Sequence, residues 1–308
     1  MPVTQSDIPN LLKAGLKTLF FDSLQNGLIK SAISKVASVV ESSQDTENYA
    51  WLGQNPIMKE FLDERQIKAL QESSFSIRNK TWEATIGVDR TAIEDDRYGQ
   101  IKVRIQSLAY EAIRHKEQMI ISLLANGFTN TCYDGQYFFD IDHVNPGADY
   151  QSAQSNKGTD ALSAASLQSA ITAMSKVKDD KGRSMGVSAD TIVVPPDLEW
   201  TARELLESVY YPEKLTGTDN QKNSANPLKN RLGLVISPYL TDTNNWYLLC
   251  TQYPVKPLIL QERTNVEFRA LESESESGFM RDQYLYGIRA RYNAGYGLWQ
   301  YAYGAIVA

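Results

Sequence analysis

Carboxylates and one histidine gather in a single stretch of the sequence, which makes it the first place to look for chemistry. Asp134, Asp140, Asp142, His143 and Asp149 fall within a loop-rich segment. The order Asp-x-Asp-His can bind a divalent cation through carboxylate oxygens and an imidazole nitrogen, so a metal-dependent hydrolase using Asp140, Asp142 and His143 is one hypothesis. The spacing matches neither an EF-hand loop nor the helical motif of zinc hydrolases. Carboxylates that cap turns are the simpler interpretation.

The remaining reactive groups do not form a catalytic set. His115, the only other histidine, stands among the charged residues Arg114, Lys116 and Glu117, which is typical of a solvated helix face. The sequence has no Gly-x-Ser-x-Gly elbow, no phosphate-binding loop and no Gly-x-Gly-x-x-Gly turn that opens a helix. The glycines of residues 292–297 lie in a β-rich run, where they permit close strand approach. We therefore expect no enzyme activity and no cofactor.

An acidic run, Glu94-Asp95-Asp96, directly precedes a long helical pattern. Negative charge at a helix N-terminus is stabilised by the helix dipole, which is one interpretation of this run. An ion pair with another subunit is the other.

Composition limits the class of protein. The chain has 308 residues, 42% of them hydrophobic, which is enough for a sizeable core. The net charge of −6 and the lack of a basic block argue against a dedicated nucleic-acid reader. Cys132 and Cys250 are far apart and read as two free buried thiols. We find no signal peptide and no apolar stretch that could span a bilayer, and we expect the protein in the cytosol where it is made.

The periodicity predicts a mixed α+β chain. Apolar residues recur every three or four positions over residues 100–126, which predicts a helix about 40 Å long that ends at Gly127 in the C′ position. Residues 75–88 alternate around Asn79-Lys80, a hairpin pattern. Residues 1–48 read as an extended arm with helical pieces. Helices at 161–177 and 198–209 and a buried strand at 191–194 precede a β-rich C-terminal run.

Aromatic content favours self-association. The chain has 17 tyrosines and five tryptophans, and such rings are enriched at protein–protein interfaces. Together with an arm, a projecting hairpin and no catalytic set, this favours a self-assembling protein. A monomeric binding module is the third possibility, beside the metal-dependent hydrolase.

Six motifs, in order along the chain, together resemble one family. They are Tyr49-x-Trp51-Leu-Gly53-x-x-Pro56, Ile77-x-Asn79-Lys80-x-Trp82-Glu83, Ile93-Glu94-Asp95-Asp96-x-Tyr98-Gly99, Cys132-Tyr-Asp134-Gly135-Gln-x-Phe-Phe139-Asp-x-Asp-His143, Val193-Val-Pro-Pro196-x-Leu-Glu199 and Tyr286-Gly-x-x-Ala-Arg291-x-x-x-Gly295-Tyr-Gly-x-Trp299. Each motif alone is weak, but the series resembles the major head subunit of Mu-like phages and prophages from about residue 2 to the C-terminus.

The resemblance implies the Hong Kong-type capsid fold of tailed phages. On that fold we expect an N-terminal arm at 1–48, entry to the peripheral domain at 49–72 and an extended hairpin loop (E-loop) at 73–98. The peripheral domain with its spine helix would then cover 99–154, the axial domain 155–255, and a return to the peripheral domain 256–308.

The resemblance also implies a function and partners. We expect a major capsid protein that assembles into hexamers and pentamers, forming an icosahedral shell around double-stranded phage DNA without sequence-specific binding. Scaffold and portal proteins are the other expected partners, the place is the virion head, and synthesis is in the bacterial host cytoplasm, with no membrane contact. A related compartment shell of the encapsulin type is an alternative. The expected subunit-interface residues are Trp51, Phe75, Asn79, Lys80, Trp82, Glu94, Asp95 and Asp96, with core packing as the other interpretation of Trp51.

Overall fold

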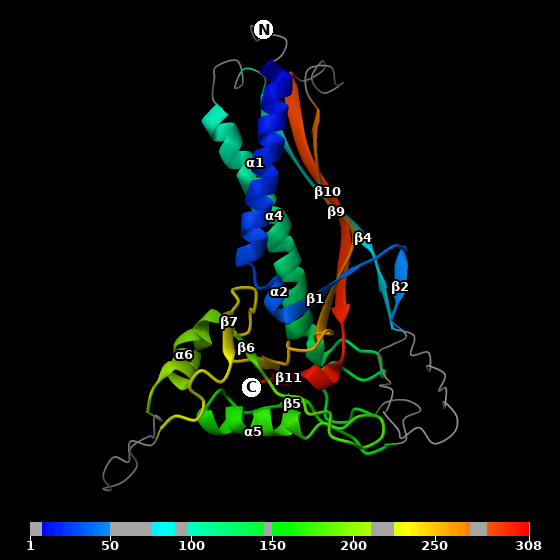
Figure 1. Cartoon of the computed structure of the whole chain (residues 1–308), viewed down its shortest axis with the longest axis vertical. Helices are drawn as coiled ribbons and strands as arrows, with labels where there is room; N and C mark the ends of the chain where they lie inside the picture. The colour runs from blue at the N-terminus through cyan, green and yellow to red at the C-terminus, as the bar shows by residue number, and fades with distance from the viewer. Residues whose placement is uncertain are drawn as a thin grey trace, which may run out of the picture.

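The structure, a computed structural model, describes residues 8–49, 75–89, 91, 98–144, 150–210, 225–271 and 282–307, without the side chains of residues 8–14 and 98. It has a long part built of two helices and a narrow sheet, and a broader part built of a second sheet and shorter helices (Figure 1). Within the described residues, no helix combines the length and apolarity needed to cross a membrane.

The long helix α4 (Tyr98–Ala125) confirms the predicted spine and runs for 28 residues, about 42 Å. A turn of 3-10 helix, η1 (Asn126–Phe128), follows it. The predicted role of Gly127 is wrong, because Gly127 is not among the glycines with positive φ. A Cβ on Gly127 would lie 2.6 Å from Cδ2 of Phe139, so glycine is required here for the close approach of that ring.

Residues 8–30 form one continuous helix that packs along the spine (Figure 1). This helix, α1 (Ile8–Lys30), buries Leu16 and Phe20 in the same core as α4. A short helix α2 (Ile33–Val36) and a strand β1 (Ala37–Glu41) follow. The expected helical pieces are confirmed, but they do not extend away from the molecule, because Leu16, Phe20, Ile33, Val36 and Ala37 are buried in the core of the long part.

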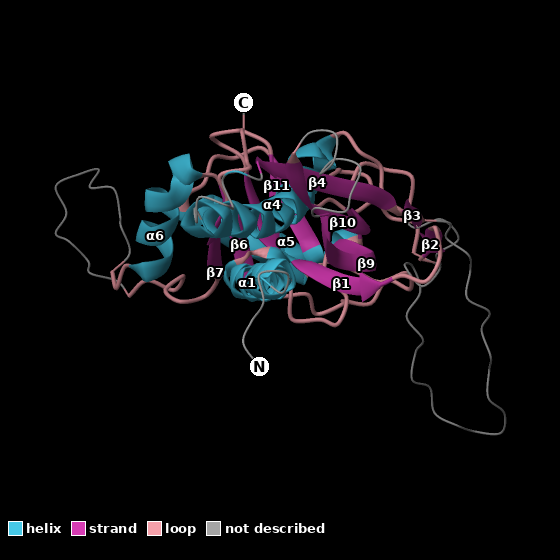
Figure 2. Cartoon of the chain, turned by 90° about the horizontal axis from the view of Figure 1, so that it is seen from above, coloured by secondary structure: helices cyan, strands magenta, loops and turns pink. Residues whose placement is uncertain are grey.

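The long part contains a four-stranded sheet in the order β1-β9-β10-β4. β9 (Leu258–Leu271) pairs parallel with β1 and antiparallel with β10 (Gln283–Tyr296). β10 also pairs antiparallel with β4 (Lys80–Asp89) along the whole of β4. Seen from above in Figure 2, the strands lie beside the two long helices, which cover one face of this sheet.

The hairpin predicted over residues 75–88 does not form. β3 (Ser76–Arg78) pairs antiparallel with β2 (Thr46–Asn48), whereas β4 pairs with β10. Asn79 lies between β3 and β4 and turns no hairpin. The alternation of this segment was read correctly as β-structure, but both partner strands are distant in sequence.

The broad part contains a five-stranded sheet in the order β5-β11-β8-β6-β7. Its strands are β5 (Lys157–Gly158), β6 (Thr191–Val194), β7 (Gly233–Ile236), β8 (Trp246–Leu249) and β11 (Ala302–Ala305). The helices α5 (Ala164–Ser175) and α6 (Glu199–Glu207), with the 3-10 turn η2 (Pro196–Leu198), confirm the two predicted helices. A separate core cluster, including Leu167 and Leu248, fills this part.

A short 3-10 turn forms one of the connections between the two sheets. β10 ends at Tyr296, and the 3-10 turn η3 (Trp299–Tyr301) leads directly into β11 of the second sheet. The predicted thiols Cys132 and Cys250 are both buried and unpaired with each other, as expected.

Candidate assembly surfaces

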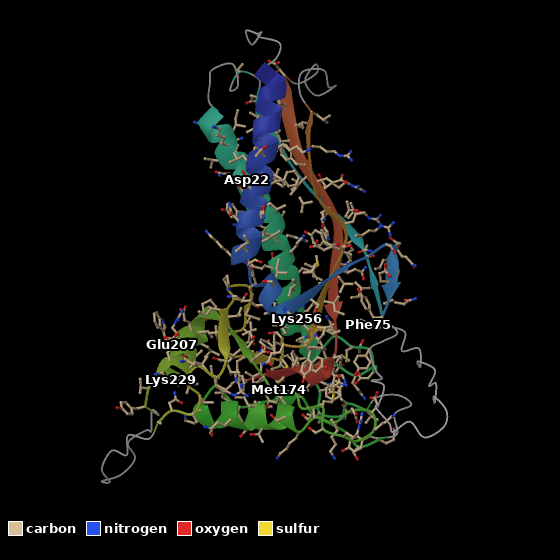
Figure 3. All side chains as sticks on the ribbon, in the orientation of Figure 1. Asp22, Phe75, Met174, Glu207, Lys229 and Lys256 are labelled. Carbon is tan, nitrogen blue, oxygen red and sulfur yellow. The ribbon has the colours of Figure 1, made fainter. Side chains whose placement is uncertain are left out.

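Of the eight expected interface residues, four can be located. Trp51, Glu94, Asp95 and Asp96 lie outside the described residues. The other four are Phe75, which directly precedes β3, Asn79, which lies between β3 and β4, and Lys80 and Trp82 in the first part of β4. Figure 3 labels Phe75 at that edge of the molecule.

Asn79 anchors its own subunit. Its side chain is 6% exposed. The Nδ2 group donates to Ser42 Oγ (2.9 Å) and to the Gln44 carbonyl (2.8 Å), and the backbone N–H donates to the Asp45 carbonyl (2.8 Å). Asn79 thereby closes the turn before β2, and its side-chain amide nitrogen is bonded within its own subunit.

Charged groups reinforce the same turn. The Glu47 carboxylate accepts hydrogen bonds from the backbone N–H groups of Ser43 (2.8 Å) and Gln44 (3.0 Å), and the Gln44 and Ser43 bonds are the main reason the pKa of Glu47 is lowered. Asp45 pairs with Arg78 of β3 (3.2 Å) and Arg291 of β10 (3.1 Å). These contacts connect the β2–β3 pair to the centre of the four-stranded sheet.

A buried glutamine fixes the other side of this pair. Gln261 of β9 is fully buried; its Oε1 accepts from the Tyr49 hydroxyl (2.8 Å) and its Nε2 donates to the Ile77 carbonyl (3.1 Å). Burial, with Glu47 nearby, raises the pKa of Tyr49 to about 12. Gly295 of β10 provides room, since a Cβ there would lie 2.5 Å from Ile77 Cδ1. The expected role of glycines in this run, close strand approach, is confirmed.

Gln261 is not among the residues that the sequence pattern singled out. Its only signal is a polar residue directly after the aliphatic run Leu258-Ile-Leu260, in the buried first part of β9. Buried amides need hydrogen-bond partners, so such a residue indicates that another segment crosses the strand there.

Trp82 is half-buried and packs against the spine helix of its own subunit. Its Nε1 donates to the Tyr292 carbonyl (3.0 Å), and its ring lies 4.3 Å from the ring of His115 on α4. His115 Nδ1 is 2.9 Å from the Tyr292 hydroxyl, and burial lowers the pKa of His115 against the opposing effect of Glu111. The expected solvated face for His115 is therefore wrong, because β4 and β10 cover it.

Lys116, beside His115, ties the spine to the sheet. Its Nζ lies 2.6 Å from Oε1 of Glu262 on β9, and the two side chains are 6% and 16% exposed. The Lys116 ammonium also lies over the Tyr292 ring, 5.0 Å from the centroid. The spine helix is thus fixed on the sheet by charge as well as by apolar packing.

The residues of the hydrolase hypothesis do not converge. His143 is buried and bonds Asp134, with 2.7 Å between Nδ1 and Oδ2. Asp140 Oδ1 accepts from the backbone N–H of Ile141 (2.8 Å), and Asp142 is exposed. Asp149 lies outside the described residues. The triad Asp140, Asp142 and His143 is therefore not assembled, and the partner that the histidine does find is Asp134.

Large apolar side chains are exposed at several places among the described residues, including the surroundings of α6 and the long helices. Around α6 these are Trp200 (76% exposed), Val209 and Tyr210, and on the long helices they include Ile29 and Val103.

Lys80, at the start of β4, is exposed and Phe75 is half-buried. In both Figure 1 and Figure 2, α6 and the β2–β3 pair lie on opposite sides of the molecule.

Comparison with known proteins gives matches to one family along nearly the whole chain. A family model described as Mu-like prophage major head subunit gpT matches residues 10–161, 150–240 and 241–306. The Mu-like prophage FluMu major head subunit of Haemophilus influenzae and the major capsid protein of Escherichia phage Mu are each 30% identical over 298 residues, which are 96% of this chain and 73% of the relative.

Solved structures show the same fold. The bacteriophage JBD30 procapsid matches with a TM-score of 0.56 and 29% identity, covering 99% of this chain and 76% of that chain. A virus-like particle from Pyrococcus furiosus matches with a TM-score of 0.55 over 95% of this chain and 98% of that chain, and at 10% identity it shows the fold alone. The expected capsid fold is confirmed, and the chain belongs to the Mu-like prophage major head subunit family, whose members are structural proteins of the phage capsid and not enzymes.

Proposed function

We propose that this head subunit assembles with copies of itself into hexamers and pentamers that close an icosahedral shell around double-stranded DNA. The observation that carries the proposal is the family match over nearly the whole chain, together with the capsid assemblies among the structural neighbours. A closed shell requires each subunit to bond several neighbours through different surfaces.

The opposite positions of α6 and the β2–β3 pair support this mode of assembly. One side presents the exposed indole of Trp200, and the other presents a strand pair held rigidly by Asn79 and Gln261. A rigid base lets a projecting segment reach a neighbour without a large loss of conformational entropy on contact. Lys80 and Phe75 remain the candidates for direct contact, while Asn79 and Trp82 position that base.

The domain assignment follows from the two sheets. We assign the four-stranded sheet with α1 and α4 to the peripheral domain, and the five-stranded sheet with α5 and α6 to the axial domain at about 155–255. Residues 302–305 join the axial domain, because β11 pairs with β8. Within the expected extended loop at 73–98, residues 80–89 are strand β4, which is paired along its length with β10, so we assign β4 to the four-stranded sheet.

Partners and location follow from the same role. Scaffold and portal proteins would meet the shell during assembly in the host cytoplasm. The net charge of −6 suits a container for nucleic acid, because a negatively charged wall does not hold the phosphate backbone tightly.

Electron microscopy and sedimentation of the expressed chain test the proposal. We expect capsomers or closed particles, and a chain that sediments as one subunit, with or without a scaffold protein, would contradict it.

A second experiment uses a variant in which Asn-Gly replaces residues 50–74. Tyr49 N–H donates to the Phe75 carbonyl (2.8 Å), so the two ends are paired, and Asn-Gly suits a tight turn between paired strands. This chain should fold but form no shells.

A matched control replaces residues 211–224 in the same way. Tyr210 and Ala225 form an isolated antiparallel bridge, so the chain ends left by this replacement are also adjacent. We expect the control to fold with its core intact. Normal particles from the 50–74 replacement would exclude that segment from the shell contacts.

A further inference from the structure

The motif that runs from Cys132 to His143 has a second feature that assembly does not explain. His143 is completely buried, and its ring stacks on Trp299 of η3 with 4.0 Å between centroids and 7° between planes. The Asp134 side chain is likewise inaccessible to solvent. This cluster lies where η3 connects the two sheets, so its protonation bears on how the two parts are held together.

Asn156 fixes the hydrogen on one ring nitrogen of His143. The Asn156 Nδ2 group donates to the carbonyls of Phe138 (2.8 Å) and Trp299 (3.3 Å), and its Oδ1 accepts from the Asp140 backbone N–H (2.9 Å). These three bonds determine which atom of the amide is oxygen. That oxygen is 3.1 Å from His143 Nε2, and an acceptor faces a ring nitrogen at this distance only when the nitrogen carries a hydrogen.

Asp134 accounts for the other ring nitrogen. Its Oδ1 accepts from the Cys132 thiol (3.0 Å) and from the Gln136 backbone N–H (3.1 Å), and its Oδ2 is 2.7 Å from His143 Nδ1. Two donors on one oxygen favour the ionised carboxylate. Burial, and then Asp134, raise the pKa of Cys132, so this thiol keeps its proton and stays a donor. Nδ1 therefore also carries a hydrogen.

We propose that His143 is an imidazolium, protonated on both ring nitrogens, and that its buried ion pair with Asp134 clamps the segment after the spine helix to η3 and to Asn156 before β5. The ring would also place a cation against the Trp299 face, which is a favourable contact. The proposal rests on hydrogen-bond geometry and does not depend on shell formation.

A metal ion is the competing interpretation of the same residues. Ligand atoms of Cys132, Asp134 and His143 lie within 4.8 Å of one another. However, two ligands bound about 2 Å from one tetrahedral zinc ion stand more than about 3 Å apart. The 2.7 Å between Nδ1 and Oδ2 is a hydrogen-bond distance, so the geometry points to a proton between them.

The charge that would balance an imidazolium comes from Asp134. Within the described residues, Asp134 is the acidic group that hydrogen-bonds the ring, whereas Asp140 bonds its own backbone neighbour and Asp142 faces solvent. From η3 and from the segment before β5, Trp299 and Asn156 contact the ring, and neither carries a charge.

Nitrogen-15 NMR of the histidine rings tests the assignment directly, on assembled particles or capsomers of the full chain. The chain has two histidines, so selective labelling gives two ring systems, and His115→Gln identifies the signals of His143. At pH 7 we expect both His143 nitrogens to show the shift and the N–H coupling of a protonated ring. An unprotonated Nδ1 would overturn the proposal, whether the proton lies on Asp134 or elemental analysis finds stoichiometric zinc. An unprotonated Nε2 would overturn it as well.

Two substitutions extend the test. Asp134→Asn removes the counter-charge, and His143 should then lose one ring proton at pH 7. Asp140→Asn is the control, because the Asp140 carboxylate lies on the same segment but does not contact the ring, and His143 should keep both protons. Two protons retained in Asp134→Asn would contradict the ion pair, and if this variant does not fold, the wild-type spectrum still decides.

Discussion

At the scale of single residues, Gln261 has the most specific role in the projecting strand pair. Gln261→Leu keeps the approximate size of the side chain but removes the two buried hydrogen bonds that Gln261 makes with the Tyr49 hydroxyl and the Ile77 carbonyl. A buried hydrogen bond contributes about 1 kcal/mol, so we expect the free energy of unfolding to fall by about 2 kcal/mol. Chemical denaturation of the dissociated subunit measures this loss.

Gln283→Leu is the matched control for Gln261→Leu. Gln283 begins β10, and its Nε2 donates to Asp89 Oδ1 (3.0 Å) at an exposed position. Solvent can replace that bond, and we expect a change within about 0.5 kcal/mol. Equal losses in the two variants would mean that Gln261 does not anchor the pair.

At the scale of elements, the attachment of the spine helix to the sheet depends on the Lys116–Glu262 pair. Lys116→Met would leave the Glu262 carboxylate largely buried without its partner (16% exposed), and breaking a buried pair in this way costs about 3–5 kcal/mol. We expect a loss of that order in the free energy of unfolding, measured by denaturant titration. The reason is that the contact between helix α4 and strand β9 is largely buried there, so water cannot replace the lost ammonium group.

The same helix supplies the control for Lys116→Met. Arg114 and Glu111 form an exposed pair (3.0 Å) on α4, with side chains 60% and 54% exposed. Arg114→Met should cost less than about 1 kcal/mol, because solvent screens such a pair. A loss from Lys116→Met as small as that from Arg114→Met would show that the Lys116–Glu262 contact does not hold the spine.

The elements also show which predictions a sequence supports. The spine was predictable because the periodicity of its apolar residues is sustained over 28 residues. The hairpin prediction was wrong because alternation identifies strands but not their partners: Lys80 of β4 pairs with Tyr292 of β10, more than 200 positions away. Asn79 resembles a turn residue, but its amide instead bonds residues 42 and 44. Side-chain bonds to distant backbone leave no local pattern.

The candidate site was predictable only in outline for the same reason. The Asp-x-Asp-His order drew attention to His143, yet its partner is Asp134, which a turn containing Gly135 brings back towards the histidine. The sequence placed His115 on a solvated face, because its neighbours on α4 are charged and the strands that cover it belong to other parts of the chain.

At the scale of the whole molecule, buried tyrosines occur in both parts of the structure. Among the described residues, burial is the main cause that raises the pKa of eight tyrosines above the usual value of 10.0. They are Tyr49, Tyr133, Tyr239, Tyr247, Tyr292, Tyr296, Tyr301 and Tyr303. They come from both sheets and from the segments between them, so their ionisation reports on the fold as a unit.

Alkaline titration should therefore unfold both parts of the chain together. A phenol whose pKa is raised by folding stays neutral in the folded chain, whereas the unfolded chain releases its proton near pH 10, so stability is retained below pH 10 and falls as pH rises above it. We expect tyrosinate absorbance to rise in two steps. In the first, near pH 10, the exposed tyrosines ionise with circular dichroism unchanged, and in the second the buried set ionises as the circular dichroism is lost. The chain in guanidinium chloride, where all tyrosines are exposed, should titrate in one step near pH 10. One step near pH 10 in the native chain, with its circular dichroism intact, would mean that these rings are accessible to water and that neither core is packed as described.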